Sequence, residues 1–266
     1  TLFPYTTLFR SIMIGVYFSG TGNTRYCLEK FLSEYQGEGK SFSIEDPNVI
    51  NIIKQNKDIV FAYPIYFSNL PKIVRDFIEI NQKEFNGKNI FIISTMGLFS
   101  GDGAGCSARL FKKYGANILG GIHLRMPDCI GDEKVLKKSL EENKAIVKKA
   151  EEKIKECANK FKTGEPLREG LGFIYHIVGL LGQRLWFYNK TRSYTDKFKI
   201  KSERCVGCGK CAAICPMNNI ELDNDKAKGK NKCTMCYRCF SNCPKQAITI
   251  LGKEVQEQCK IEKYIK

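Results

Sequence analysis

Between residues 13 and 161, short apolar runs alternate with longer stretches in which apolar residues recur every three or four positions. This alternation is typical of strand–helix units that build a parallel sheet. The predicted strands are 14–18, 41–44, 59–62, 90–94 and 118–124, and the predicted helices are 24–35, 47–55, 71–80, 104–114 and 132–161. The pattern therefore predicts an α/β fold with a doubly wound parallel sheet.

The periodic region is followed by a change of pattern. Residues 163–198 contain recurring glycines and mix aromatic with basic side chains, which predicts a connector between two domains. Its apolar part, 171–188, is most simply a short helix packed between the domains, and contact with a membrane or partner surface is the alternative. At the other end, residues 1–12 show no coherent period, and we interpret them as a non-native or disordered leader.

From Cys205 onward the sequence repeats, because CVGCGKCAAICP is matched by CTMCYRCFSNCP further along the chain. Each copy reads C-x2-C-x2-C-x3-C-P, the spacing in which three thiolates bind one [4Fe-4S] cluster and the fourth binds the other cluster. Structural zinc is the competing interpretation, but this complete spacing, found twice, favours clusters. The predicted ligands are Cys205, Cys208, Cys211 and Cys243 for the first cluster, and Cys215, Cys233, Cys236 and Cys239 for the second.

Residues 199–252 resemble a bacterial-type two-cluster ferredoxin, and residues 253–266 follow as a C-terminal tail. The resemblance includes all eight cysteines and the prolines at 216 and 244. It implies one-electron transfer at low potential through two clusters that lie close enough to exchange electrons.

A second motif, SGTGNT, follows the first predicted strand and opens the first predicted helix. Its glycines permit a tight turn, and its hydroxyls and backbone N–H groups together can hold one phosphate. The motif lacks the lysine of a P-loop, and Arg25 occupies the third glycine position of a dinucleotide fingerprint. A plain strand–helix turn is the alternative. The candidate phosphate-binding residues are Ser19, Gly20, Thr21, Gly22, Asn23 and Thr24.

Two more loops follow the third and fourth predicted strands, at the edge of the sheet where ligands collect in doubly wound folds. With SGTGNT, these loops make residues 13–162 resemble a flavodoxin, whose first loop binds the phosphate of FMN. The resemblance implies a flavodoxin-like sheet of order 2-1-3-4-5 and contacts to the flavin ring from both later loops. The expected ring contacts are Pro64, Tyr66, Phe67, Asn69, Thr95, Met96, Gly97 and Phe99.

Together the two resemblances indicate a flavodoxin–ferredoxin fusion protein, of the kind found in anaerobic bacteria and archaea. We therefore expect an electron-transfer protein that passes single electrons between FMN and two [4Fe-4S] clusters, to or from a redox partner. The alternative is an FMN-dependent reductase of a quinone or nitro compound that uses the clusters as an internal relay. We assign no catalytic residue, because the sequence contains no hydrolase or c-type haem motif.

The charge balance bears on the partner, since 43 Lys and Arg against 28 Asp and Glu give a net charge of +15. Such a field favours an acidic partner, an anionic membrane surface or nucleic acid, and charge alone does not choose between them. We expect an acidic redox protein, either a ferredoxin or a reductase, and a solvated surface without a partner is the alternative. Nucleic acid is not expected, because no helix-turn-helix or RNA-binding motif occurs. The lack of a signal peptide and of an 18-residue apolar run indicates the cytoplasm. The oligomeric state is not predicted.

Overall fold

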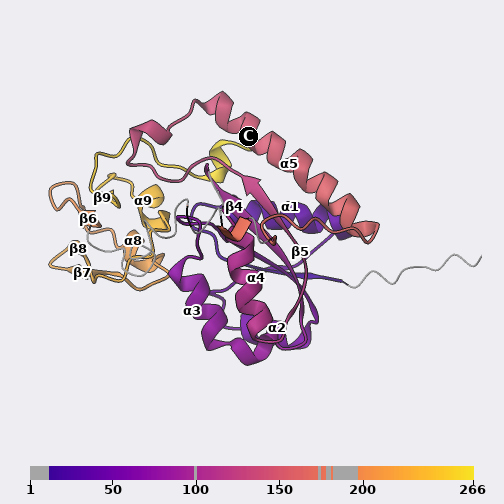
Figure 1. Cartoon of the computed structure of the whole chain (residues 1–266). Coiled ribbons are helices and arrows are strands. Elements are labelled where there is room, and N and C mark those ends of the chain that lie inside the picture. The colour runs from indigo at the N-terminus through magenta and orange to yellow at the C-terminus, as the bar shows by residue number, and fades with distance from the viewer. Residues whose placement is uncertain (1–11, 99–100, 173–174, 178–180, 182–196) are drawn as a thin grey trace, which may run out of the picture.

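The computed structural model describes residues 12–98, 101–172, 175–177, 181 and 197–266 (Figure 1). Most of the expected leader and much of the apolar segment 171–188 lie outside the described residues. Five strands form one sheet in the order β2-β1-β3-β4-β5, and all four pairings are parallel, which confirms the predicted fold class. The strands are β1 (Ile14–Tyr17), β2 (Ser41–Ser43), β3 (Asp58–Pro64), β4 (Asn89–Met96) and β5 (Asn117–Arg125).

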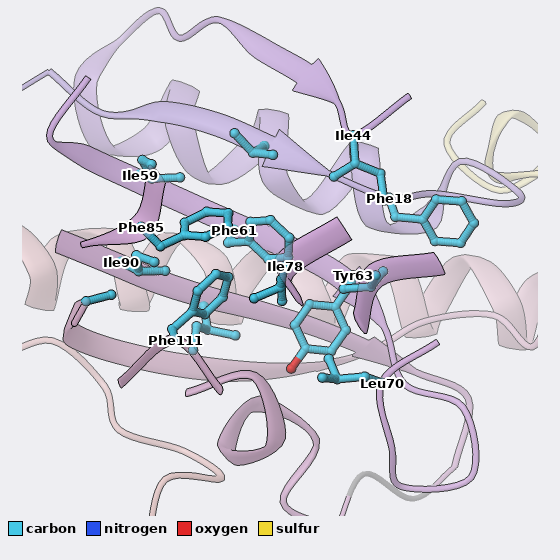
Figure 2. Packing of buried hydrophobic residues seen from close by; sticks show 14 of the residues in the cluster. Phe18, Ile44, Ile59, Phe61, Tyr63, Leu70, Ile78, Phe85, Ile90 and Phe111 are labelled. Carbon is cyan, nitrogen blue, oxygen red and sulfur yellow. The ribbon is translucent and has the colours of Figure 1, made fainter. Parts of the chain in front are cut away.

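Helices cover both faces of this sheet (Figure 1). One face carries α1 (Asn23–Gln36) and α5 (Leu140–Lys162); the other carries α2 (Val49–Gln55), α3 (Lys72–Ile80), α4 (Gly103–Lys113) and the 3-10 helix η1 (Gln82–Phe85). Strand side chains alternate between the two layers, since Val60 packs toward α1 whereas Phe61 packs with Phe85 and Phe111 (Figure 2). The Phe111 ring lies 5.0 Å from that of Phe61 and 4.8 Å from that of Phe85. Strands buried on both faces account for their continuous apolar runs.

The last helix of this domain begins later than the sequence pattern predicts. We expected a helix over 132–161, but α5 begins at Leu140, and residues 134–136 form the 3-10 helix η2. The hydroxyl of Ser139 accepts the Glu142 N–H at 3.2 Å, and the Glu142 carboxylate accepts the Ser139 N–H at 2.8 Å. This capping box starts the helix, and its Ser-x-x-Glu signature is visible in the sequence.

The cysteine-rich part forms a small α+β domain beside the sheet. Strand β6 (Lys199–Ile200) pairs antiparallel with β9 (Ile248–Thr249), and β7 (Ile220–Asp223) pairs antiparallel with β8 (Lys226–Gly229). Two short helices, α8 (Lys210–Ala213) and α9 (Arg238–Asn242), follow the corresponding turns of the two repeats. Ile220, Tyr237, Phe240 and Ile248 form its core together with several of the cysteines. The two repeats thus pack against each other, as their length requires.

Contacts between residues that are far apart in the sequence join the two domains. Asp132 is buried, and its carboxylate accepts the Tyr237 hydroxyl at 2.9 Å and the N–H groups of Ile250 and Leu251 at 2.8 and 2.6 Å. The chain then returns to the first domain, where Ile261, in the 3-10 helix η5 (Ile261–Lys263), donates its N–H to the Thr21 carbonyl at 3.1 Å. Asp132 therefore belongs to a domain contact rather than to a helix. Within the described residues, no helix is long and apolar enough to cross a membrane.

A buried histidine in the sheet predicts a pH dependence of stability. The Nε2 atom of His123 on β5 accepts the Ala104 N–H at 3.1 Å, and burial lowers the pKa of His123 from 6.5 to about 4. In the unfolded chain the His123 imidazole becomes protonated below about pH 6.5, whereas in the folded protein it becomes protonated only below about pH 4. We therefore expect the free energy of unfolding to fall by about 1 kcal/mol between pH 7.5 and 5.5 through this residue.

Urea unfolding of the wild type and of His123→Gln at these two pH values measures the effect. The glutamine retains an acceptor for the Ala104 N–H but does not titrate. The variant should lose about 1 kcal/mol less than the wild type over this interval. Equal losses in both proteins would contradict the assignment.

Candidate cofactor sites

A cavity of about 280 Å³ lies at the carboxyl ends of the central strands. The three predicted loops supply most of its walls, which makes it the crevice expected of a doubly wound sheet. Gly22 and Asn69 do not line the cavity, and Phe99 lies outside the described residues. The predicted residues that line it are Ser19, Gly20, Thr21, Asn23, Thr24, Pro64, Tyr66, Phe67, Thr95, Met96 and Gly97.

One end of the cavity suits a phosphate group. Helix α1 begins after Gly22, whose φ of 96° is left-handed, and it has neither a side-chain cap nor an acidic residue in its first turn. Its first N–H groups therefore carry uncompensated positive charge at the cavity. Thr24 and Thr95 share a buried hydrogen bond of 2.7 Å between their hydroxyls, which ties this loop to the end of β4. These donors fit an anion.

The other end of the cavity is apolar and aromatic. Tyr66 and Asn69 exchange two backbone hydrogen bonds of 3.1 and 2.9 Å around a turn in which Phe67 and Ser68 have φ values of 50° and 55°. This left-handed turn presents Tyr66 and Phe67 to the cavity, where planar rings can stack on a planar ligand. The side-chain oxygen Oδ1 of Asn69 accepts the Leu70 N–H at 2.8 Å and an Arg75 N–H at 3.0 Å. Asn69 thus shapes the turn without lining the cavity.

A fourth loop, after β5, also lines the cavity, and the sequence analysis missed it. Asp128 lies so close to Gly97 that a Cβ atom on this glycine would come within 2.2 Å of the Asp128 carboxylate. The carboxylate also accepts the Ile130 N–H at 2.8 Å, and burial raises the pKa of Asp128. The position of this loop at the end of the fifth strand could have identified it. Its lining residues are Met126, Asp128, Cys129 and Ile130, and Leu136 follows from η2.

The eight repeat cysteines surround two further cavities in the second domain. Cys205, Cys208, Cys211 and Cys243 line one, and Cys215, Cys233, Cys236 and Cys239 line the other, which is the grouping that the spacing predicts. The fourth cysteine of each repeat thus crosses to the cavity of the other repeat. Thiols arranged in this way, in largely apolar surroundings, fit iron–sulfur clusters.

Backbone N–H groups point at several of these sulfurs. The Ala227 N–H lies 3.4 Å from the Cys205 sulfur and lowers the pKa of this thiol. The Met235 N–H donates to the Cys233 sulfur at 3.3 Å, although burial raises the pKa of Cys233 to about 12. Such donors stabilise thiolates and tune cluster potentials. Burial also raises the pKa of Cys236 and of Cys239, so Cys233, Cys236 and Cys239 depend on bound iron for deprotonation more than Cys205 does.

The second repeat also forms a wall of the large cavity. Met235, Cys236 and Tyr237 line it opposite the loops of the first domain. A Cβ atom placed on Gly20 would lie 1.9 Å from the Cys236 carbonyl oxygen, so the two backbones touch and only glycine fits between them. The sequence gives no local signal for this wall, because it arises from the packing of two domains.

Arg238 bridges the two domains beside this wall. Its guanidinium donates to the Ser19 carbonyl at 2.8 Å and makes a two-pronged ion pair with Glu45, with N–O distances of 2.6 and 2.7 Å. It also lies 5.9 Å from the centre of the Phe18 ring. Because Arg238 stands between two cluster cysteines in the sequence, this contact fixes the second repeat on the first loop.

Comparisons with known proteins agree with this division. The flavodoxin domain family matches residues 14–118, and the 4Fe-4S dicluster domain family matches residues 204–247. A ferredoxin-like protein in the nif region of Sinorhizobium fredii is 41% identical over 18% of this chain and 84% of its own length. An uncharacterized ferredoxin of Methanocaldococcus jannaschii is 32% identical over 24% of this chain, and the match spans only 45% of that relative.

Among solved structures, two-electron reduced Megasphaera elsdenii flavodoxin matches 44% of this chain and 89% of its own, with a TM-score of 0.40 and 24% identity. The flavodoxin match contains the loops after β1, β3 and β4 that line the large cavity, and the dicluster match contains all eight thiols of the two sets. The chain therefore belongs to the flavodoxin–ferredoxin fusion proteins, in which an FMN-binding flavodoxin domain is followed by a ferredoxin domain with two [4Fe-4S] clusters.

Proposed function

We propose that this protein passes single electrons between FMN and its two clusters and exchanges them with a redox protein. One observation supports the proposal: Met235, Cys236 and Tyr237 of the second repeat form a wall of the large cavity, which we assign to FMN and call the FMN cavity. FMN supplies one- and two-electron chemistry when bound, and each cluster supplies one-electron chemistry. Because Cys236 is a predicted ligand of the second cluster, this cluster would be the one beside the flavin and the first cluster would lie farther out.

The chain's own residues hold this junction rigid. Tyr237 is buried and donates its hydroxyl to Asp132, and burial keeps the pKa of Tyr237 far above its usual value, so that it remains a donor. Cys236 is only 7% exposed, so its side chain has little contact with solvent. A dry and rigid contact keeps reorganisation small when electrons move, which favours transfer within the chain over loss to solvent.

The same proposal includes an acidic redox protein, a ferredoxin or reductase, as the partner. The ferredoxin relatives support a redox-protein partner, and the net charge of +15 favours an acidic one. It also places the protein in the cytoplasm, because a reducing compartment preserves cluster thiols.

Anaerobic purification followed by stepwise photoreduction tests the proposal. We expect about eight iron, eight sulfide and one FMN per chain. Spectra during reduction should show electrons redistributing between the flavin and the clusters without an added mediator. Clusters that become reduced while the flavin stays oxidised, with no exchange on standing, would contradict the proposal. Rapid turnover with a quinone or nitro compound, and none with a ferredoxin, would favour the small-molecule reductase.

The Arg238 bridge gives a separate prediction. Arg238→Ala removes the ion pair with Glu45 and leaves the Ser19 carbonyl without this donor, so we expect a loss of about 1–3 kcal/mol in the free energy of unfolding. Arg25→Ala is the matched control, because Arg25 pairs with Glu29 on the exposed surface of α1 and should cost about 0.5 kcal/mol or less. Denaturant unfolding of the loaded proteins measures both. Equal losses would show that Arg238 does not anchor the domains.

A further inference from the structure

The cavity of the first cluster opens on the outer end of the second domain. Val206, Cys208, Lys210, Leu222 and Lys245 line its mouth, and we call these five residues the outer cluster face. The β7–β8 hairpin, which contributes Leu222, lies at the end of the molecule away from the large sheet (Figure 1). We infer that an acidic electron-carrier protein docks on the outer cluster face. This inference rests on the proposed function and names the surface through which electrons enter or leave.

Exposure of apolar side chains beside a cluster ligand is the first observation. Val206 is 58% exposed and Leu222 is 47% exposed, and Cys208 is itself exposed. By contrast, Cys236 beside the FMN cavity is buried. Small transient interfaces have an apolar centre within a polar rim, and the two exposed side chains provide such a centre. The first cluster is thus the one that a second protein can approach closely.

The charge of the rim is the second observation. Among the described residues, those that line this cavity include Lys210 and Lys245, both exposed, and no acidic residue. Nearby, Lys228 and Lys230 pair with Asp223 and Glu221, so those four charges largely compensate one another. The remaining positive rim complements an acidic surface, which accelerates encounter and selects the partner by charge.

The same face fits other polyanions less well. Single-stranded nucleic acid binds on aromatic platforms, and no aromatic ring is found among the described residues that line this cavity. Membrane surfaces bind long amphipathic faces, whereas the part of the chain that the structure describes exposes only two large apolar side chains at this mouth. An acidic protein of small contact area is the ligand class that matches both the apolar centre and the basic rim.

Charge reversal tests the inference. The probe is a purified acidic two-cluster ferredoxin, and its dissociation constant is measured by calorimetry at low and moderate salt. The double variant Lys210→Glu/Lys245→Glu should bind it at least about tenfold more weakly at low salt. The control Lys148→Glu/Lys155→Glu makes the same charge change on the exposed face of α5 and should stay within about twofold. Iron and flavin are quantified in every variant.

Leu222→Ser provides a second variant, should the charge reversal disturb the clusters. It leaves all charges in place and should weaken binding about threefold or more at any salt concentration. Equal affinity of the wild type and both face variants would overturn the inference. So would binding of anionic vesicles or duplex DNA that is lost in the same variants while ferredoxin binding is absent. A failure of the proposed function can be distinguished from a failure of this inference. The proposed function fails if the wild type shows no electron exchange between the flavin and the clusters.

Discussion

Replacement of Gly20 by alanine should weaken FMN binding and loosen the contact of the second domain with the first. A Cβ atom at this position would lie 1.9 Å from the carbonyl oxygen and 2.9 Å from the carbonyl carbon of Cys236. Both are backbone atoms of a cysteine whose sulfur is expected to bind a cluster, so they cannot rotate away. Either the first loop or the second repeat must move. Overpacking of this kind costs about 1–3 kcal/mol, which would weaken FMN binding by about 5- to 150-fold.

Fluorescence titration of flavin-depleted protein with FMN measures this affinity, and thermal unfolding measures the loss of stability from the weakened domain contact. Gly172→Ala is the control, because its Cβ atom would make only an ordinary contact, 3.6 Å from the Tyr175 ring. We expect the control to bind FMN like the wild type. Unchanged FMN affinity and thermal stability in Gly20→Ala would show that the two backbones are not held together in solution.

The two clusters should differ most in how the loss of one cysteine ligand from each affects FMN binding. Cys236→Ser and Cys208→Ser should each lower the iron content from about eight to about four per chain. Only Cys236 lies on the wall of the FMN cavity, so only its substitution should also weaken FMN binding, by about tenfold or more, and raise the fluorescence of the remaining flavin. Cys208 is exposed on the outer face and should leave the flavin affinity unchanged.

Iron analysis, acid extraction of flavin and fluorescence measure these effects on the same samples. Cys259→Ser serves as the control for a buried cysteine outside both sets of ligands, and it should retain about eight iron. If Cys208→Ser weakened flavin binding as strongly as Cys236→Ser, the proposed arrangement would be wrong. In that arrangement the second cluster lies beside the flavin and the first cluster lies farther away. A full iron content in Cys236→Ser would remove this residue from the ligand set.

Local pattern was sufficient to predict the sheet and the grouping of the thiols. Strands β1, β3, β4 and β5 are largely buried and read as apolar runs, and the cysteine spacing predicts which turns surround which cavity. The position of the SGTGNT loop between β1 and α1 was equally visible, because a glycine-rich turn between strand and helix has a local sequence signature. These features depend on residues close together along the chain.

The features that escaped prediction depend on contacts between distant residues. Apolar spacing through Leu136 extended the last helix too far, because the buried carboxylate of Asp132 binds the second domain and Ser139 starts the helix instead. The cavity wall formed by Met235 and Cys236 is likewise a product of domain packing. Asn69 was assigned to the flavin by its position in the loop, whereas its amide oxygen is occupied in shaping the turn.

The hydrogen bond from Ile261 to Thr21 has a consequence for how the protein is made. Ile261 packs against Gly22 of the phosphate loop, where a Cβ atom on the glycine would approach it to 2.4 Å. During synthesis the phosphate loop leaves the ribosome early, and Ile261 leaves it only after every cluster cysteine has emerged. This loop therefore acquires its contacts with Ile261 only after the cluster cysteines have been translated, so the flavin site is completed after the ferredoxin domain has emerged.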